Sequence, residues 1–472
     1  MNINPLIFRA YDIRGIATPS ESYPVADLTP ETIELIGKAT GTYMKRTYNT
    51  QNMLVGRDNR LHSPDLQAAF IKGVLSTGVD VTNVGLATSP LLYYAVCKYQ
   101  TDSGVNITAS HNPKEYNGVK IVGKNAHSVC GDELQKIVKL IQENDFESGE
   151  GKLSEKNDCF DDYVKDIKGR MQLARPLKVV VDAGNGTAGA FAPQLLRAIG
   201  AEVIELYCDL DGNYPNHEAN PEEEKNMLDL GKLVREHKAD LGLGFDGDGD
   251  RVGVVDENGK HYSADYLLIL LSRDLLKHKA GAQIVFDVKV SQVLIDEITS
   301  LGGVPVMSKT GHSFIESKMH ELSAPLGGEI SGHMFFGKDH YDYYGFDDAF
   351  FAACKILQLL SQGSETFSNQ FATLRQMRTT PEFKAYCPDD KKFAVVKKVT
   401  DAFTRTHQCI TIDGVRVNFD KDSWGAIRSS NTSPNLTLRF EALNEQRLKE
   451  IQKIMVSELK KYPEVSLAWY QE

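Results

Sequence analysis

The sequence predicts an α/β protein with three related domains, each containing a mixed, mainly parallel sheet, followed by a C-terminal α+β domain. The chain has 472 residues, and at roughly 100–200 residues per domain it has room for about three or four domains. One strand–helix–strand pattern recurs three times along the chain, and the C-terminal part departs from it. These observations favour a multidomain protein over one large sheet.

Each copy of the repeated pattern consists of an apolar strand ending in Asp, a turn, an amphipathic helix closed by Gly, and a second strand. The first strands lie at 53–58, 177–186 and 282–291, and the helices at 65–78, 187–200 and 292–303. Units of this kind build parallel sheets with right-handed crossovers. The alternative, a single doubly wound sheet, would require long insertions between the units.

The C-terminal region mixes the two kinds of element. FKAYCP, ITIDGVRVNFD, WGAIRSS and NLTLRFEAL are strand-like, whereas KKFAVVKKVTDAFTR and LNEQRLKEIQKIMVSELKKY have helical spacing. Charged, polar stretches at 143–158, 256–265 and 360–370 separate the patterned regions. The predicted domains are therefore 1–154, 155–257, 258–371 and 372–472.

Composition narrows the function classes. The 53 Lys and Arg against 64 Asp and Glu give a net charge of -11, which argues against general binding to nucleic acid or anionic membrane. No apolar run approaches the roughly 18 residues that a membrane span needs, and MNINPLIFRAYDIRG lacks the features of a secretory signal. The seven cysteines are scattered without a C-x-x-C pair, as expected of reduced thiols. We expect a soluble cytoplasmic protein.

The strongest local motif is GFDGDGDR at 244–251. Asp246, Asp248 and Asp250 alternate with glycines and can turn inward around one hard cation. A calcium loop of the EF-hand type is the main rival, but its sixth position would be Arg251 where that loop needs Gly, and the flanks are strand-like. Three carboxylates with vacant coordination positions suit Mg²⁺ that also binds a phosphate oxygen. A plain acidic turn is the remaining alternative.

A second motif, GVNITASHNP at 104–113, presents Ser110 in a loop after an apolar strand. Phosphoryl transfer needs a nucleophilic oxygen in line with the phosphate, and a loop serine beside a metal meets that need. An ordinary turn-initiating serine is equally compatible with the sequence. A Ser-His-Asp hydrolase is disfavoured because the chain has no G-x-S-x-G elbow and His111 directly follows Ser110.

Two other segments carry groups that could bind a sugar phosphate, but each is weak evidence when taken alone. GGEISGH at 327–333 offers an acid, a hydroxyl and an imidazole for sugar hydroxyls, and RSSNTSP at 428–434 offers a guanidinium with hydroxyl and amide donors for a phosphate dianion. Both are also compatible with polar turns. Five single residues could likewise belong to a site or be ordinary surface groups: Tyr11, Arg14, Lys120, Lys289 and His312.

Taken together, FRAYDIRG, TASHNP, GFDGDGDR, GEISGH and RSSNTSP resemble the α-D-phosphohexomutase family in identity and order, over nearly the whole chain. DIRG near the N-terminus is similar to the phosphomannomutase/phosphoglucomutase branch. The resemblance implies four domains around a central cleft, three of them related α/β units. It also implies hexose phosphate substrates, and we expect a monomer or a weak dimer.

The resemblance further implies a role for each matching residue. Ser110 is phosphorylated and, with Asp246, Asp248 and Asp250, holds one Mg²⁺. Catalytic groups beside Ser110 are Lys120, Arg251 and His333. Glu329 and Ser331 contact sugar hydroxyls. The non-reacting phosphate is held by Arg428, Ser430, Asn431 and Thr432. The cleft is completed by Tyr11, Arg14, Lys289 and His312.

The expected reaction is reversible phosphate transfer between the 1- and 6-positions of mannose or glucose phosphate, with glucose 1,6-bisphosphate as activator and intermediate. Lys120 leads as general base, provided that a neighbouring Arg lowers its pKa. Ile330 stands where Met is common in the branch, a departure that bears on substrate preference. Three alternatives stay open: a phosphoglucosamine mutase, a non-catalytic sugar-phosphate-binding protein, and a calcium-stabilised interaction protein.

Overall fold

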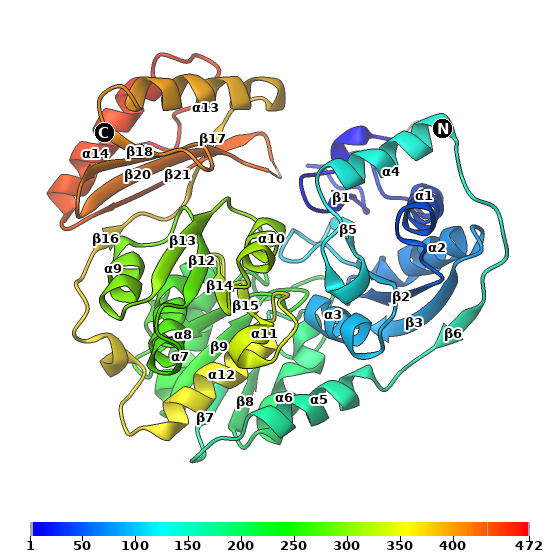
Figure 1. The fold of residues 1–472 in the computed structure, drawn as a ribbon, viewed down its shortest axis with the longest axis horizontal. Coiled ribbons are helices and arrows are strands. Elements are labelled where there is room, and N and C mark those ends of the chain that lie inside the picture. The colour runs from blue at the N-terminus through cyan, green and yellow to red at the C-terminus, as the bar shows by residue number, and fades with distance from the viewer. Residues whose placement is uncertain (1–2, 432, 471–472) are drawn as a thin grey trace.

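The N-terminal sheet has six strands in the order β1-β5-β4-β2-β3-β6. In the computed structural model, which describes residues 3–431 and 433–470, this domain lies on the right of Figure 1. Its helices α1 and α3 begin where Thr29 and Thr88 accept hydrogen bonds from Thr32 N and Leu91 N, each followed by Pro in the first turn. The elements are η1 (Pro5–Ile7), β1 (Ile13–Ile16), α1 (Pro30–Tyr48), β2 (Asn52–Arg57), α2 (Ser63–Leu75), β3 (Asp80–Leu86), α3 (Ser89–Lys98), β4 (Ser103–Ile107), β5 (Tyr116–Val122), η2 (Lys124–Ala126), α4 (Asp132–Glu143) and β6 (Leu153–Glu155).

The second sheet has five strands in the order β11-β10-β9-β7-β8. Its elements are α5 (Cys159–Arg170), β7 (Lys178–Asp182), η3 (Thr187–Ala190), α6 (Ala192–Ala198), β8 (Glu202–Leu206), η4 (Glu224–Met227), α7 (Leu228–His237), β9 (Leu241–Phe245), β10 (Val252–Val255) and β11 (His261–Tyr262). The helix predicted over 187–200 is divided into η3 and α6. Pro193 lies in the first turn of α6, and its missing N–H and bulky ring prevent a helix from running through this point.

The third sheet has four strands in the order β13-β12-β14-β15. Its elements are α8 (Ala264–His278), β12 (Gln283–Asp287), α9 (Gln292–Ser300), β13 (Val304–Ser308), α10 (His312–Leu322), β14 (Leu326–Gly328), β15 (Met334–Phe336), α11 (Lys338–Tyr341), α12 (Ala349–Gln362) and η5 (Ser368–Phe371). The predicted strand–helix–strand unit corresponds to β12, α9 and β13.

These three sheets share one topology, which confirms the predicted relation between the first three domains. In each, a central strand (β2, β7, β12) has two parallel neighbours. One neighbour (β4, β9, β14) is followed along the chain by an antiparallel strand (β5, β10, β15). The sheets are therefore mixed with a parallel centre, as predicted.

The fourth domain, at the upper left of Figure 1, is built differently. All pairings in its sheet are antiparallel, and its helices cover one face of the sheet, which confirms the predicted α+β class. Its elements are β16 (Arg378–Thr379), β17 (Phe383–Tyr386), α13 (Asp389–Phe403), β18 (Gln408–Ile410), β19 (Val415–Asp420), β20 (Ser423–Ser429), β21 (Asn435–Ala442) and α14 (Glu445–Leu459).

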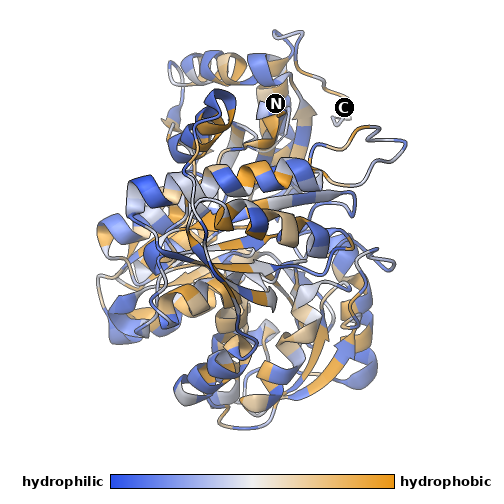
Figure 2. Cartoon of the chain, turned by 90° about the vertical axis from the view of Figure 1, so that its right-hand side faces the viewer, coloured by the Kyte–Doolittle hydropathy of each residue, from blue (hydrophilic) through white to orange (hydrophobic). Residues whose placement is uncertain are grey.

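The helices carry hydrophilic and hydrophobic residues in turn along their length, as Figure 2 shows. This amphipathic pattern is typical of helices that cover a sheet on one side and face solvent on the other. Among residues 3–431 and 433–470, no helix combines the length and the apolar composition that crossing a membrane requires.

Candidate active site

Each of the first three domains supplies one functional loop, and the loop lies at the same place in each sheet. The serine loop connects β4 to β5, the aspartate loop connects β9 to β10, and the Glu329–His333 loop connects β14 to β15. These are the equivalent hairpins of the shared topology. A repeated fold thus places three chemically different loops in equivalent positions, from which they meet at one site.

Ser110 and the aspartate loop are in direct contact. Ser110 is 2% exposed, and its Oγ donates a hydrogen bond to Asp246 Oδ2 at 2.7 Å. Its φ of 51° lies in the left-handed region, which is unusual for serine and is a form of backbone strain that collects at functional sites. Gly247 allows this approach, because a Cβ there would lie 2.3 Å from Ser110 O. The nucleophile and metal loops predicted from sequence form one site.

The three aspartates form a buried group suited to a hard divalent cation. One ligand oxygen of each lies within 4.8 Å of the others, and each residue is at most 1% exposed. Burial and the neighbouring carboxylates of Asp250 and Asp248 raise the pKa of Asp246 well above its usual value. Asp248 Oδ1 and Asp250 Oδ1 are buried without a hydrogen-bond partner among the described residues. Unpartnered carboxylate oxygens of this kind are the ligands that Mg²⁺ and Ca²⁺ prefer.

The strands on either side of this loop decide between the two kinds of cation loop considered above. Phe245 and Val252 pair across the antiparallel hairpin of β9 and β10. An EF-hand loop is flanked by helices, so the EF-hand interpretation is wrong for this segment.

Lys120 also contacts the aspartate group. It lies on β5, is 4% exposed, and its Nζ donates to Asp248 Oδ2 at 2.7 Å and to Asp250 Oδ2. Burial acts to lower the pKa of Lys120, but the two carboxylates outweigh burial and hold this pKa well above its usual value. The pKa shift is opposite to the expected one, because the closest charges are carboxylates and not a guanidinium.

Arg251 and His333 belong to a chain of buried hydrogen bonds that ends on Asp347. Arg251 Nε donates to His333 Nε2 at 3.0 Å, and His333 Nδ1 lies 2.7 Å from Asp347 Oδ2. Burial lowers the pKa of His333 to about 3, so its imidazole is neutral and donates from Nδ1 to Asp347. Sequence reasoning missed Asp347, whose only signal was a pair of acidic residues before an apolar helix.

His111 was also missed as a site residue. Its Nδ1 lies 3.0 Å from Ser110 Oγ, although adjacency in sequence had counted against contact with the serine. Burial lowers the pKa of His111 well below its usual value, so the ring is neutral. The left-handed conformation of Ser110 turns the chain sharply at this point, and neighbouring side chains can then face one another.

A buried arginine fixes the serine loop. Arg60 is 1% exposed and pairs with Asp58 at 3.1 Å. Its guanidinium donates to three carbonyl oxygens of the loop, those of Ser110 (2.9 Å), Asn112 (2.7 Å) and Pro113 (2.7 Å). A planar guanidinium with five donors can satisfy several carbonyls at once. The only sequence signal for Arg60 was its place shortly after an apolar strand.

The predicted sugar-binding residues line the adjoining part of the site. Glu329 is 4% exposed and accepts a hydrogen bond from Gly311 N at 2.6 Å; burial and the nearby Asp287 raise its pKa to about 8. The Tyr11 ring meets His312 edge-on at 5.2 Å between centroids, and His312 lies 5.7 Å from His333. Ser331 is half-buried in the same turn as Glu329.

The predicted phosphate clamp lies where the third and fourth domains meet. Arg428 on β20 is 5% exposed; its Nε donates to Asp413 Oδ2 at 2.6 Å, and its buried Nη2 has no hydrogen-bond partner among the described residues. Asn431 Nδ2 donates to Thr310 O across the domain boundary at 3.3 Å. Ser430 Oγ lies 2.9 Å from Ser433 Oγ, and Thr432 lies outside the described residues.

Two more predicted cationic residues complete the site. Arg14 donates to Asp12 at 2.7 Å and to Asn112 Oδ1 of the serine loop at 2.8 Å. Lys289 Nζ donates to Glu382 Oε2 of the fourth domain at 2.7 Å. Tyr11 lies between the sugar-binding residues and the phosphate clamp, because its ring meets His312 and its hydroxyl lies near Arg428 and Asn431. Burial raises the pKa of Tyr11, while Arg428 and a hydrogen bond from Asn431 act to lower it.

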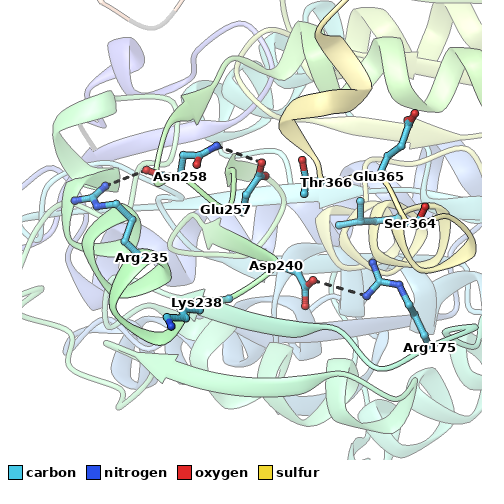
Figure 3. Close-up of a pocket in the computed structure, with 11 residues that line it drawn as sticks. Arg175, Arg235, Lys238, Asp240, Glu257, Asn258, Ser364, Glu365 and Thr366 are labelled. Atoms are coloured by element: carbon cyan, nitrogen blue, oxygen red, sulfur yellow. Dashed lines mark hydrogen bonds and ion pairs between the residues drawn. The ribbon is translucent and has the colours of Figure 1, made fainter.

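A separate cavity of about 450 Å³ contains none of the predicted site residues. Figure 3 shows its charged lining, in which Arg175 points toward Asp240 and Arg235 toward Asn258; Lys238, Glu257 and Glu365 are further charged residues of the lining. Arg175 pairs with Asp240 at 3.7 Å, both of them substantially exposed. Balanced, solvated charges are weak binding determinants, so the buried cluster around Ser110 is the candidate active site.

Known proteins match this chain in sequence and in fold. Four phosphoglucomutase/phosphomannomutase domains match the chain: alpha/beta/alpha domain I at residues 5–148, domain II at 161–259, domain III at 263–377 and the C-terminal domain at 382–458. A phosphomannomutase/phosphoglucomutase of Pseudomonas aeruginosa is 43% identical over 455 residues, which cover 96% of this chain and 95% of that protein. A phosphoglucomutase of Neisseria gonorrhoeae is 38% identical over 451 residues, 94% of this chain and 95% of the other.

Structural similarity extends over the same length. The crystal structure of a phosphoglucomutase/phosphomannomutase family protein from Burkholderia thailandensis superposes with a TM-score of 0.89 at 36% identity, covering 98% of each chain. The domain matches, the sequence identity to relatives and the shared architecture all indicate the same family. The chain therefore belongs to the phosphoglucomutase/phosphomannomutase family.

Proposed function

We propose that this protein is a phosphohexomutase that moves phosphate reversibly between the 1- and 6-positions of mannose and glucose phosphates. The observation that carries the proposal is the contact of Ser110 Oγ with Asp246, inside a buried group of three carboxylates. A coupled assay with glucose 1-phosphate, mannose 1-phosphate and glucosamine 1-phosphate, each with glucose 1,6-bisphosphate as activator, tests it. We expect turnover of the first two; turnover of glucosamine 1-phosphate alone would instead identify a phosphoglucosamine mutase.

The proposed reaction has two symmetrical halves. In the first half, a bond from the sugar hydroxyl oxygen to phosphorus forms and the hydroxyl proton passes to a base, while the bond between phosphorus and Ser110 Oγ breaks and Oγ keeps the electron pair and takes up a proton. The hexose 1,6-bisphosphate so formed then reverses its orientation within the site, so that its other phosphate faces Ser110. In the second half, Ser110 Oγ gives up its proton and bonds to the other phosphorus, the bond between that phosphorus and the sugar oxygen breaks, and the sugar oxygen takes up a proton.

We propose Mg²⁺ as the divalent cation, with one ion per chain held by Asp246, Asp248, Asp250 and an oxygen on Ser110. When bound, Mg²⁺ supplies positive charge that offsets the negative charge of a phosphoryl group in transfer. Two arginines of the chain hold the loop that carries Ser110: Arg60 donates to the Ser110 carbonyl and Arg14 to the Asn112 side chain. The predicted candidates for the base are Lys120, Arg251 and His333, which all border the aspartate group or its neighbours. The raised pKa values of Lys120 and Arg251 keep both side chains protonated, whereas the ring of His333 is neutral.

The charge of the substrate supports this assignment of the lining. A bisphosphate carries up to about four negative charges, whereas the protein has a net charge of -11. The site therefore has to be locally basic. Its cationic residues come from all four domains: Arg14, Lys120, Arg251, Lys289 and Arg428.

Arg428→Ala should raise KM for glucose 1-phosphate by about 10²-fold while leaving Ser110 able to accept phosphate. The reason is that a bidentate guanidinium–phosphate contact contributes a few kcal/mol to binding, whereas Arg428 lies outside the serine loop. Steady-state kinetics and intact mass spectrometry after incubation with glucose 1,6-bisphosphate measure the two properties. An unchanged KM would show that Arg428 is not part of a phosphate clamp.

Arg60→Lys should lower kcat by about 10²-fold with a small change in KM, because misplacing a reacting group by about 1 Å costs that much. The ammonium of lysine keeps the charge but cannot reach three carbonyls of the loop together. Steady-state kinetics measure kcat and KM of the variant, and thermal unfolding shows whether its fold is retained. The exposed Arg405→Lys is the matched control. Equal kcat in both variants would contradict the role given to Arg60.

Two other function classes make different predictions. A non-catalytic sugar-phosphate-binding protein would carry no phosphate on Ser110 after incubation with the bisphosphate. A calcium-stabilised interaction protein would bind Ca²⁺ more tightly than Mg²⁺ and turn over none of the sugars. The four domain ranges given above, a cytoplasmic location and a monomer or weak dimer stay predictions.

A further inference from the structure

The sheet of the fourth domain has one apolar and one charged face. Side chains alternate along β19, β20 and β21: Val417, Ile427 and Phe440 belong to the core under α13 and α14, and the intervening residues point the other way. On that other face lie Arg416, Trp424, Arg428, Arg439 and Glu441. Each of these five is at most 6% exposed. A charged sheet face buried to this degree must be covered by another part of the protein, which here is the third domain.

The contact is made to one loop of the third domain. Arg416 Nη1 donates to the carbonyl oxygens of Val288 and Val290, both at 2.8 Å. Arg439 Nη1 donates to the carbonyl oxygen between them, that of Lys289, at 3.0 Å. Two arginines of the fourth domain therefore cap three consecutive carbonyls between β12 and α9.

Neighbouring groups hold the two arginines and the loop in place. The Arg416 guanidinium stacks 3.9 Å from the centroid of the Trp424 ring. Trp424 Nε1 donates to Glu441 Oε1 at 2.8 Å. The same oxygen accepts from the backbone N of Gln292 at 2.8 Å, at the N-terminus of α9, where a carboxylate is favoured by the helix dipole.

The capped loop carries Lys289 into the active site. The Lys289 side chain is 8% exposed and reaches Glu382 of the fourth domain. Without the two arginines, three buried carbonyls would lose these partners, and a buried polar group without a partner is unfavourable. The backbone position of Lys289 thus depends on contacts made by another domain.

We propose that Arg416 and Arg439 are positioning residues, which set the place of Lys289 by capping the carbonyls of residues 288–290. Arg428 projects from the same sheet face. Docking of the fourth domain on the third therefore positions the phosphate clamp and Lys289 relative to each other. This inference rests on the proposed function for its kinetic consequence only.

A double-mutant cycle tests the proposal. Arg416→Gln should lower kcat/KM for glucose 1-phosphate by about 10- to 10²-fold in the otherwise unchanged enzyme, as expected for a displaced substrate-binding group. In the Lys289→Ala background the same change should lower it by less than about threefold, since coupled residues are not additive. Arg447→Gln, at a half-exposed pair with Asp420 on the same domain, is the control and should leave kcat/KM unchanged.

Equal losses in both backgrounds would overturn the proposal. If thermal unfolding shows that Arg416→Gln does not fold, Arg439→Gln carries the same cycle, because it removes the central cap, together with the 3.8 Å ion pair to Asp265. Amide hydrogen exchange of a peptide spanning residues 287–292 is a readout independent of turnover. We expect faster exchange in either variant without substrate; unchanged exchange would also overturn the proposal. If the wild type had no turnover but the variants had faster amide exchange than the wild type, the proposed function would be refuted and this inference would stand.

Discussion

Ser110→Ala is expected to abolish mutase turnover, with a loss of at least about 10⁴-fold in kcat, because removal of a covalent nucleophile eliminates the path through the phosphoenzyme. The fold should be retained. Alanine deletes one oxygen that contacts Asp246 and His111, and Arg60 binds the backbone carbonyl, which is unaffected. Initial rates with glucose 1-phosphate and glucose 1,6-bisphosphate measure the effect.

The exposed Ser457→Ala is the matched control and should have wild-type rates. Intact mass spectrometry adds a second measurement: the wild type should gain one phosphoryl group from the bisphosphate and Ser110→Ala should gain none. Turnover by Ser110→Ala within about 10²-fold of the wild type would exclude a phosphoserine mechanism, given the losses that nucleophile removal causes elsewhere.

Asp248→Asn should have the second largest effect, lowering kcat by about 10²- to 10³-fold and raising the Mg²⁺ concentration needed for half-maximal rate. The substitution keeps the shape of the side chain but removes one of three negative charges that attract a hard cation. It also removes one of the two carboxylates that accept hydrogen bonds from Lys120 Nζ. A titration of turnover against Mg²⁺ separates weaker metal binding from a slower reaction at saturating metal.

The exposed Asp161→Asn controls for the change in net charge and should have a wild-type Mg²⁺ curve. If Asp248→Asn had that same curve, the aspartate loop would not bind the catalytic metal. Parallel titrations with Ca²⁺ test the remaining interaction-protein alternative, which requires tighter Ca²⁺ binding and no turnover.

Much of the fold followed from local patterns. Apolar runs and helical spacing predicted β2, α2 and β3 and their two counterparts, because strand and helix periodicities are properties of short segments. The split of the 187–200 helix depended on Pro193, a signal that was present in the sequence and passed over. The shared hairpins that carry the three functional loops became visible only through strand pairing, which joins segments distant in the chain.

The sequence by itself determined which chemistry the protein can carry: a loop serine, three alternating aspartates, and glycines such as Gly247 that allow them to meet. Only the tertiary structure decided how these groups are supported and charged. Arg60 and Arg416 donate hydrogen bonds to carbonyls about 50 and 130 residues away in the chain. No local sequence pattern can therefore predict these contacts. The pKa of Lys120 rises because two carboxylates lie within hydrogen-bond reach in a buried site. Electrostatic effects depend on distance and burial, and neither is fixed until the domains have packed together.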